Sequence, residues 1–167
     1  QGDRQVALYE PGELPEDNTV KIPVGTYTLK AYNAAYNEQE SWGDNEPGEA
    51  AYYAEKPISV TENETNTVKL DVPMVNFGVS LRLPEGFETW FKNPTFSILV
   101  GTRSVQLTKD ETAYFPYAEG VEFTYTLAAL NQDNENNTDI GTYTTVEAGT
   151  VYTVTYSLPE GLSVSGL

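Results

Sequence analysis

The chain has 167 residues and a net charge of −16, from 25 acidic and 9 basic side chains, and it contains neither cysteine nor histidine. A surface this acidic repels phosphate backbones and anionic headgroups, which argues against binding to nucleic acid. The missing residue types exclude cysteine nucleophiles, histidine-based triads and the usual Cys/His zinc sites. With 39% hydrophobic residues, the chain can build a core, as one domain or as two small β-halves.

In the first part of the chain, apolar and polar residues alternate in short runs that are separated by turn residues. Alternation with period 2 is typical of strands that have one face in a core. Pro23 indicates a sheet edge or a strand end, because proline cannot donate to a ladder. We expect strands at residues 5–9, 20–24, 26–32, 58–60 and 67–72. The last two of these form a predicted hairpin.

Residues 33–50 lose the alternation and have the composition of a long polar loop. Four aromatic residues lie in or beside this loop: Trp42, Tyr36, Tyr52 and Tyr53. Such rings can stack on the flat faces of a sugar, which makes these four the ligand-contact candidates of a carbohydrate-binding module. In the alternative interpretation, which the tendency of Trp and Tyr to bury favours, the rings fold back and cover an open end of the β-structure.

The clearest strand signal of the chain covers residues 75–83, where apolar residues alternate with polar residues or glycine at all nine positions. A turn at 84–86 follows. Phe87, Trp90 and Phe91 then have the i, i+3, i+4 spacing of a helix, which predicts one helical turn that caps the core.

The second half of the chain repeats the strand pattern. Strands are expected at residues 96–100, 105–107, 114–117, 121–129, 141–146 and 150–158. The first two of these and the last two have short turns between them, which predicts two hairpins. An acidic, Asn-rich loop at 131–139 joins the strand expected at 121–129 to the one expected at 141–146.

The hairpin predicted at 58–72 and the one predicted at 141–158 have similar patterns, which suggests a duplicated β-unit. So many short strands predict an all-β fold, an antiparallel β-sandwich of two abutting transthyretin-like or immunoglobulin-like units, with at most one short helical turn. The expected division is an N-terminal β-unit at 1–72, a C-terminal β-unit at 73–158 and a tail or linker at 159–167.

Pairs of acidic residues occur along the chain, but they fall in predicted turns, as Glu62 and Glu64 do. A glycosidase needs two carboxylates at a fixed separation across a cleft, one of them with a raised pKa. Carboxylates in solvated turns have no reason for such a shift. We therefore predict no catalytic residues, no cofactor and no enzymatic activity.

The acidic loop offers oxygen ligands at alternating positions, as the start of an EF-hand loop does: Asp133, Glu135, Asn137 and Asp139. However, Thr138 occupies the position that requires glycine, and Thr144 the position of the bidentate glutamate. The incomplete pattern favours a polar hairpin tip, so these four residues are weak calcium candidates.

Several segments occur in a familiar order: 22–31, 51–60 and 67–79, followed by the aromatic residues at 87–91 and by 113–115. Over residues 20–158, this order resembles a family of Bacteroides-type surface lipoproteins of unknown function, described as cell-adhesion proteins with fimbrillin-like folds. The motifs are structural, so the resemblance transfers no site residue. It implies an exported protein at the cell surface or outer membrane.

From these observations we expect a non-enzymatic, exported surface module of a bacterial adhesin or fimbria-like protein, in which a rigid β-scaffold presents loops 33–50 and 131–140. Its partners would be a host protein, a glycan, or a neighbouring subunit that adds a strand to an open sheet edge. Gln1 is not an initiator methionine. We expect an export signal, a lipid-attachment cysteine and the start of the first strand upstream, with membrane contact only through that anchor.

Overall fold

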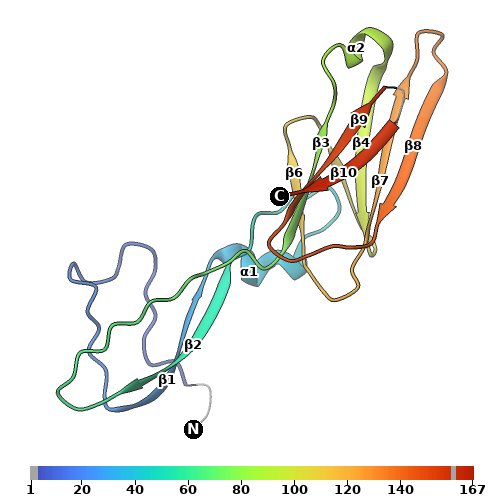
Figure 1. The fold of residues 1–167 in the computed structure, drawn as a ribbon. Coiled ribbons are helices and arrows are strands. Elements are labelled where there is room, and N and C mark those ends of the chain that lie inside the picture. The colour runs from blue at the N-terminus through green and yellow to red at the C-terminus, as the bar shows by residue number, and fades with distance from the viewer. Residues whose placement is uncertain (1–3, 159–160) are drawn as a thin grey trace. The chain divides into compact units, whose positions relative to one another are not determined.

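The computed structural model describes residues 4–158 and 161–167, and these are built mainly from strands, which confirms the all-β prediction (Figure 1). In chain order the elements are β1 (Gly25–Tyr32), α1 (Ala34–Glu38), the 3-10 helix η1 (Gln39–Ser41), β2 (Tyr53–Val60), β3 (Phe77–Arg82), α2 (Phe87–Trp90), β4 (Lys92–Val100), β5 (Arg103–Leu107), β6 (Thr112–Phe115), β7 (Phe123–Leu130), β8 (Asn136–Tyr143), β9 (Val151–Ser157) and β10 (Gly161–Gly166). None of the helices in the described residues has the length and apolar character needed to span a membrane.

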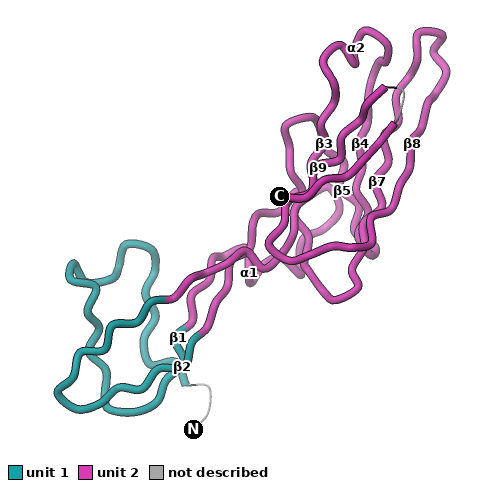
Figure 2. Tube along the Cα trace, in the orientation of Figure 1, with its two compact units in different colours: residues 1–29, 56–69 teal, residues 30–55, 70–167 magenta. Residues whose placement is uncertain are grey.

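The chain divides into two compact units (Figure 2). The N-terminal unit comprises Gln1–Leu29 and Lys56–Lys69, and the sandwich unit comprises Lys30–Glu55 and Leu70–Leu167. This division differs from the expected boundary between 72 and 73, because the segment 30–55 belongs with the C-terminal strands. Hydrogen bonds within the sandwich unit explain why 30–55 belongs to it: the Val75 amide, for example, donates to the Ala51 carbonyl at 2.8 Å.

The sandwich unit contains two four-stranded sheets, with the strand orders β10-β9-β3-β6 and β5-β4-β7-β8. Alternation along β7 determines which face is buried, since Phe123, Tyr125, Leu127 and Ala129 are buried and the residues between them are half-exposed. The apolar faces of both sheets supply one continuous core. Burial of this area is the main force that holds the two layers together.

One of the two hairpins predicted in the second half of the chain is wrong. The segments 141–146 and 150–158 do not form a hairpin, because β8 pairs with β7 in one sheet while β9 lies in the other sheet. The chain crosses between the layers at 144–150 and buries Val146 on the way. As a result β9 runs parallel to β3, with Leu81 opposite Val154, whereas only antiparallel pairs were expected. The hairpin predicted at 96–107 is confirmed as β4 and β5.

The expected tail is a strand over most of its length. β10 pairs antiparallel with β9 and places Leu162 opposite Tyr156 and Val164 opposite Val154, so both apolar residues lie on the core side. The short run of alternation at 161–166 became a strand because β9 offers it a complete ladder. Residues 159 and 160 of the expected tail lie outside the described residues.

Helical turns are also more frequent than predicted, because α1 and η1 occupy the expected loop in addition to α2. Asn33 begins α1 as its N-cap, and its side-chain oxygen accepts a hydrogen bond from the Tyr36 amide at 3.3 Å. Asparagine is among the preferred N-cap residues for this reason.

The N-terminal unit differs most from the expectation. The prediction of a strand at 26–32 is confirmed as β1, and β2 is longer than the predicted 58–60. No regular strand forms at 5–9, 20–24 or 67–72, and no residue is buried within 4–29 or 56–69. Alternation alone did not produce strands here, because a strand also needs a regular ladder of backbone hydrogen bonds with a neighbouring strand. A second complete β-unit is therefore not found in the described part of residues 1–72.

Candidate functional site

Three tyrosines of the sandwich unit form a cluster beside α1. The rings of Tyr36 and Tyr53 stack with their centres 4.3 Å apart and their planes 17° apart. Tyr32 lies 6.1 Å from Tyr36 and is half exposed. Of the four predicted ligand-contact residues, the structure thus stacks two, Tyr36 and Tyr53. Each of these rings uses one face on the other, so the pair offers a ligand less flat surface than two separate rings would.

Asn33 explains why the tyrosines meet. Its side-chain oxygen accepts hydrogen bonds from the amides of Tyr36 and Tyr52, and its side-chain nitrogen donates to the Ala50 carbonyl at 2.7 Å. One asparagine therefore holds the start of α1 against the strand that begins at Tyr53. Tyr52 itself is 41% exposed and lies opposite Met74 in an isolated bridge.

The Tyr53 hydroxyl donates to the Glu55 carboxylate at 2.5 Å. This hydrogen bond is the main cause that raises the pKa of Tyr53 to about 12, with burial as the second cause. The phenol therefore stays neutral at physiological pH, and its hydroxyl group donates a hydrogen bond to Glu55.

Trp42, the fourth predicted ligand-contact residue, is folded back against the sandwich. Its ring lies directly over Gly48, where an added Cβ would come within 2.5 Å of the ring. Gly48 has φ +67°, a left-handed conformation that glycine adopts without steric cost. Within the described chain, Trp42 makes no ring contact with the three tyrosines. The four candidates thus do not share one platform, and Trp42 lies where the covering interpretation predicts it.

Arg103 fixes Trp42 in this position. The guanidinium carbon lies 5.5 Å from the centre of the Trp42 ring and 4.5 Å from that of Phe115, so the cation contacts two aromatic faces. The same group donates to the Gly43 carbonyl at 3.1 Å, to the Tyr114 carbonyl at 2.7 Å and to the Glu46 carbonyl. Burial lowers the pKa of Arg103, and the nearby carboxylates of Glu46 and Asp44 oppose that change.

The segment 43–47 closes one side of the sandwich through these contacts. Its side chains accept from the amides of β5, as Asp44 does from Ser104 at 2.8 Å and Asn45 from Gln106 at 3.1 Å. The Pro47 carbonyl accepts from the Tyr114 amide in β6 at 2.7 Å. This strap covers one edge strand of each sheet, β5 and β6, so the predicted presenting loop 33–50 is, in this stretch, part of the scaffold.

We expect Arg103→Lys to lower the free energy of unfolding of the sandwich unit by about 2 kcal/mol, because an ammonium cannot serve three separate carbonyls and two rings as the planar guanidinium does. Urea denaturation followed by tryptophan fluorescence measures this change, since Trp42 and Trp90 both belong to the sandwich unit. The matched control is Arg82→Lys on the exposed end of β3, with an expected change within about 0.5 kcal/mol. Equal effects of the two substitutions would contradict the role of Arg103.

Two acidic residues in turn segments, Glu46 and Glu111, cap their own turns. The Glu46 carboxylate accepts from the Gly43 amide at 2.5 Å, and the Glu111 carboxylate accepts from the Thr108 amide at 2.8 Å. The bond from the Thr108 backbone is the first cause that lowers the pKa of Glu111. An acid catalyst needs the opposite shift.

The four weak calcium candidates lie along the β7–β8 hairpin. The amides of Asp133 and Glu135 both donate to the Asn131 side-chain oxygen at 2.9 Å, which closes the turn. Asn137 and Asp139 lie in β8, opposite Ala129 and Leu127. Within residues 4–158 and 161–167, no group of three or more Asp, Glu, His or Cys side chains could hold a metal ion.

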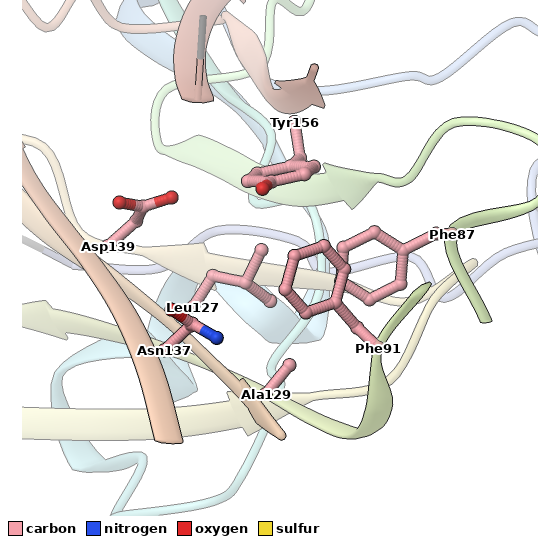
Figure 3. A pocket seen from close by; sticks show the side chains of 7 residues that line it. All are labelled: Phe87, Phe91, Leu127, Ala129, Asn137, Asp139 and Tyr156. Carbon is pink, nitrogen blue, oxygen red and sulfur yellow. The ribbon is translucent and has the colours of Figure 1, made fainter. Parts of the chain in front are cut away.

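Asn137 and Asp139 instead line a small hollow at the end of the sandwich, which we call the aromatic hollow (Figure 3). It has a volume of about 20 Å³. Its lining consists of Phe87, Phe91, Leu127, Ala129, Asn137, Asp139 and Tyr156. Figure 3 shows the Tyr156 ring above Leu127, with Phe91 and Phe87 on one side and the Asp139 carboxylate on the other.

Sequence reasoning found the parts of this hollow but not their combination. The spacing of Phe87 and Phe91 predicted a helical cap, and Phe87 is indeed buried, but Trp90, which was grouped with them in that cap, is 57% exposed. The sequence pattern indicates Asp139 only as a weak calcium candidate. Tyr156 comes from β9 in the opposite sheet, so no local pattern could place it near Asp139.

Comparison with known proteins gives a family and no function. The chain matches the family described as Domain of unknown function (DUF4493) over residues 5–166. No curated protein and no solved structure matches it. Because the match spans nearly the whole sequence, the chain belongs to the DUF4493 family of domains of unknown function.

Proposed function

We propose that the chain is a non-enzymatic surface module of a bacterial adhesin or fimbria-like assembly, and that its N-terminal unit joins a neighbouring subunit by strand addition. The observation that carries this proposal is the uncovered apolar surface of the N-terminal unit. In residues 4–29 and 56–69 no side chain is buried, although the sequence alternates as a core-forming strand does.

Three apolar side chains of the N-terminal unit are more exposed than their place in the alternating pattern predicts. Val20 is 38% exposed, Val24 64% and Leu29 37%. These residues belong to alternating runs whose apolar members should face a core. In the described chain, β1 and β2 form a sheet of two strands, and such a sheet is at best marginally stable in water without further cover. A strand from a neighbour would supply both the missing ladder and the missing apolar face.

The sandwich unit supplies the other half of the proposal. Its core is closed, and its 43–47 strap covers the edges of β5 and β6, so it suits the role of a rigid scaffold. Carboxylates that cap their own turns support a non-enzymatic role. The resemblance to surface lipoproteins supports export to the cell surface or outer membrane, with an upstream lipid anchor as the membrane contact.

The geometry supports strand addition better than glycan binding by the four aromatic residues Trp42, Tyr36, Tyr52 and Tyr53. Trp42 packs between Gly48 and Arg103, and Tyr36 stacks on Tyr53. A ligand would have to displace these contacts to use the rings as a shared platform. A host protein could be the partner in strand addition just as another subunit could.

The experiment is hydrogen exchange on the full chain with synthetic ten-residue peptides of alternating valine and threonine. Strand addition should raise the protection of amides in 25–29 and 56–60, by about 100-fold when the peptide concentration is 100 times its Kd. Control peptides of the same composition with a central proline cannot complete a ladder and should give no protection.

A matched pair of variants tests the face that is used. Leu29→Lys alters the apolar face of β1, and Thr28→Lys alters its neighbour on the opposite face. We expect Leu29→Lys to reduce the peptide effect at least tenfold and Thr28→Lys to leave it nearly unchanged. No gain of protection across the panel, or equal protection by the proline peptides, would refute strand addition.

A further inference from the structure

We propose that the aromatic hollow binds the ammonium group of a lysine side chain from a partner protein. This inference concerns the sandwich unit and goes beyond the strand addition proposed for the N-terminal unit. Three rings and one carboxylate line the hollow, and these groups and the size of the hollow all suit an ammonium group.

The rings form a partial cage. The centres of Phe87 and Phe91 are 4.9 Å apart with nearly parallel planes, and the Tyr156 ring stands at 86° to both, 5.3 Å from Phe87 and 6.0 Å from Phe91. Phe87 and Phe91 each use one face on the other, so a cation in this space meets only the free ring faces. A cation within about 6 Å of such faces is attracted by the ring quadrupoles.

A carboxylate completes the cage. Asp139 lies opposite Leu127 in the β7–β8 ladder, and because Leu127 faces the core, Asp139 points to the same side of the sheet. Within the described residues, Asp139 has no ion-pair partner. Its negative charge also contributes to the raised pKa of Tyr156, after burial as the larger cause, which is consistent with its position near that ring.

The volume favours a small cation. About 20 Å³ is slightly more than one water-sized probe needs, and an ammonium group is close to water in size. A trimethylammonium or a planar guanidinium is larger. The floor of the hollow is buried, at 3% exposure for Phe87 and Leu127, while Asn137 and Asp139 at its rim are exposed. A lysine could therefore place its ammonium between the rings and Asp139 and leave its alkyl chain over the rim.

Charge and surface chemistry indicate that the lysine comes from a protein. The net charge of −16 attracts basic partners over long range. Trp90, on the same helical turn as Phe87, exposes 57% of its surface, and tryptophan is enriched among the residues that contribute most to binding at protein interfaces.

The test is NMR titration of the full chain at 0.15 M salt with the peptide N-acetyl-Gly-Lys-Gly-amide. We expect saturable shifts of the ring protons of Phe87, Phe91 and Tyr156, with a Kd of about 1 mM. The same peptide with acetylated lysine keeps the alkyl chain but not the charge, and it should bind at least tenfold more weakly. The trimethyl-lysine peptide should also bind more weakly, because its head exceeds the hollow.

Two isosteric variants distinguish binding in the hollow from attraction by the negative charge of the whole protein. Asp139→Asn removes the carboxylate of the hollow, and Asp133→Asn removes the same charge from the tip of the same hairpin. We expect Asp139→Asn to weaken binding about tenfold and Asp133→Asn to change it less than twofold at this salt concentration. Phe91→Leu, which removes one ring, should weaken binding without changing the amide spectrum elsewhere.

The inference is wrong if the acetylated peptide binds as tightly as the lysine peptide, if trimethyl-lysine binds more tightly, or if both Asp variants weaken binding equally. It is also wrong if no saturable shift occurs in the hollow. None of these results bears on hydrogen-exchange protection in the N-terminal unit, so the two proposals fail separately.

Discussion

Replacing Phe77 by alanine is expected to lower the free energy of unfolding of the sandwich unit by about 4 kcal/mol. Phe77 is fully buried, and its ring lies 5.7 Å from Phe115, 6.1 Å from Phe123 and 6.4 Å from Tyr152. These rings come from β6, β7 and β9, so Phe77 connects both sheets. Truncation removes the buried area and leaves a cavity that close packing on both sides prevents from collapsing.

Urea denaturation followed by tryptophan fluorescence measures this loss. Phe77→Leu fills most of the same volume and should cost about 1 kcal/mol. Ile140→Ala removes apolar surface that is 67% exposed and should change the stability by no more than about 0.5 kcal/mol. A Phe77→Ala effect no larger than that of Ile140→Ala would mean that the sheets do not pack through this ring.

Strong alternation was a reliable predictor wherever both faces of the strand had a defined environment. The pattern at 75–83 became β3, and the one at 121–129 became β7, each with its apolar residues in the core. The physical reason is that a shift by one residue would expose every apolar side chain of such a strand. The sequence therefore determines the face and the register of these strands.

Partners of strands were less predictable, because they depend on residues far apart in the sequence. The short turn between the strands expected at 141–146 and 150–158, which contains Ala148-Gly149, predicts a hairpin. In the structure the Gly149 amide donates to the Asn76 carbonyl at 2.8 Å, and the turn joins two different sheets. Local turn chemistry does not distinguish a hairpin from a crossover between layers.

The candidate site also contains some features that the sequence predicts and others that it does not. Burial tendency favoured a covering role for Trp42, in agreement with its packing against Gly48. The role of Arg103 could not be found from the sequence, because its acceptors at Gly43, Glu46 and Tyr114 come from two distant segments. The aromatic hollow depends likewise on strands of opposite sheets. Alternation at 5–9, 20–24 and 67–72 predicted strands, but none of these described segments forms a regular strand.

The second large effect is expected at Asn76, which is fully buried and polar. Its side-chain oxygen accepts from the Ala51 amide at 2.9 Å, and its side-chain nitrogen donates to the Glu49 carbonyl at 2.9 Å. Asn76→Ala removes the partner of the Ala51 amide at a buried position and of the Glu49 carbonyl at a partly buried one. We expect the free energy of unfolding to fall by about 3 kcal/mol, as measured by urea denaturation.

Asn76→Asp provides the sharper test, because its effect should depend on pH. The carboxylate can still accept from the Ala51 amide, but it cannot donate to the Glu49 carbonyl, and burial disfavours its charge. Burial should therefore raise the pKa of this aspartate above its unfolded value of about 3.9. A raised pKa means that the contribution to stability is fully present below that value and is lost as the pH rises through the folded pKa. The difference in unfolding free energy between Asn76→Asp and the natural sequence should therefore be small at pH 4 and large at pH 7. Equal differences at the two pH values would show that the donor to Glu49 is not what Asn76 contributes.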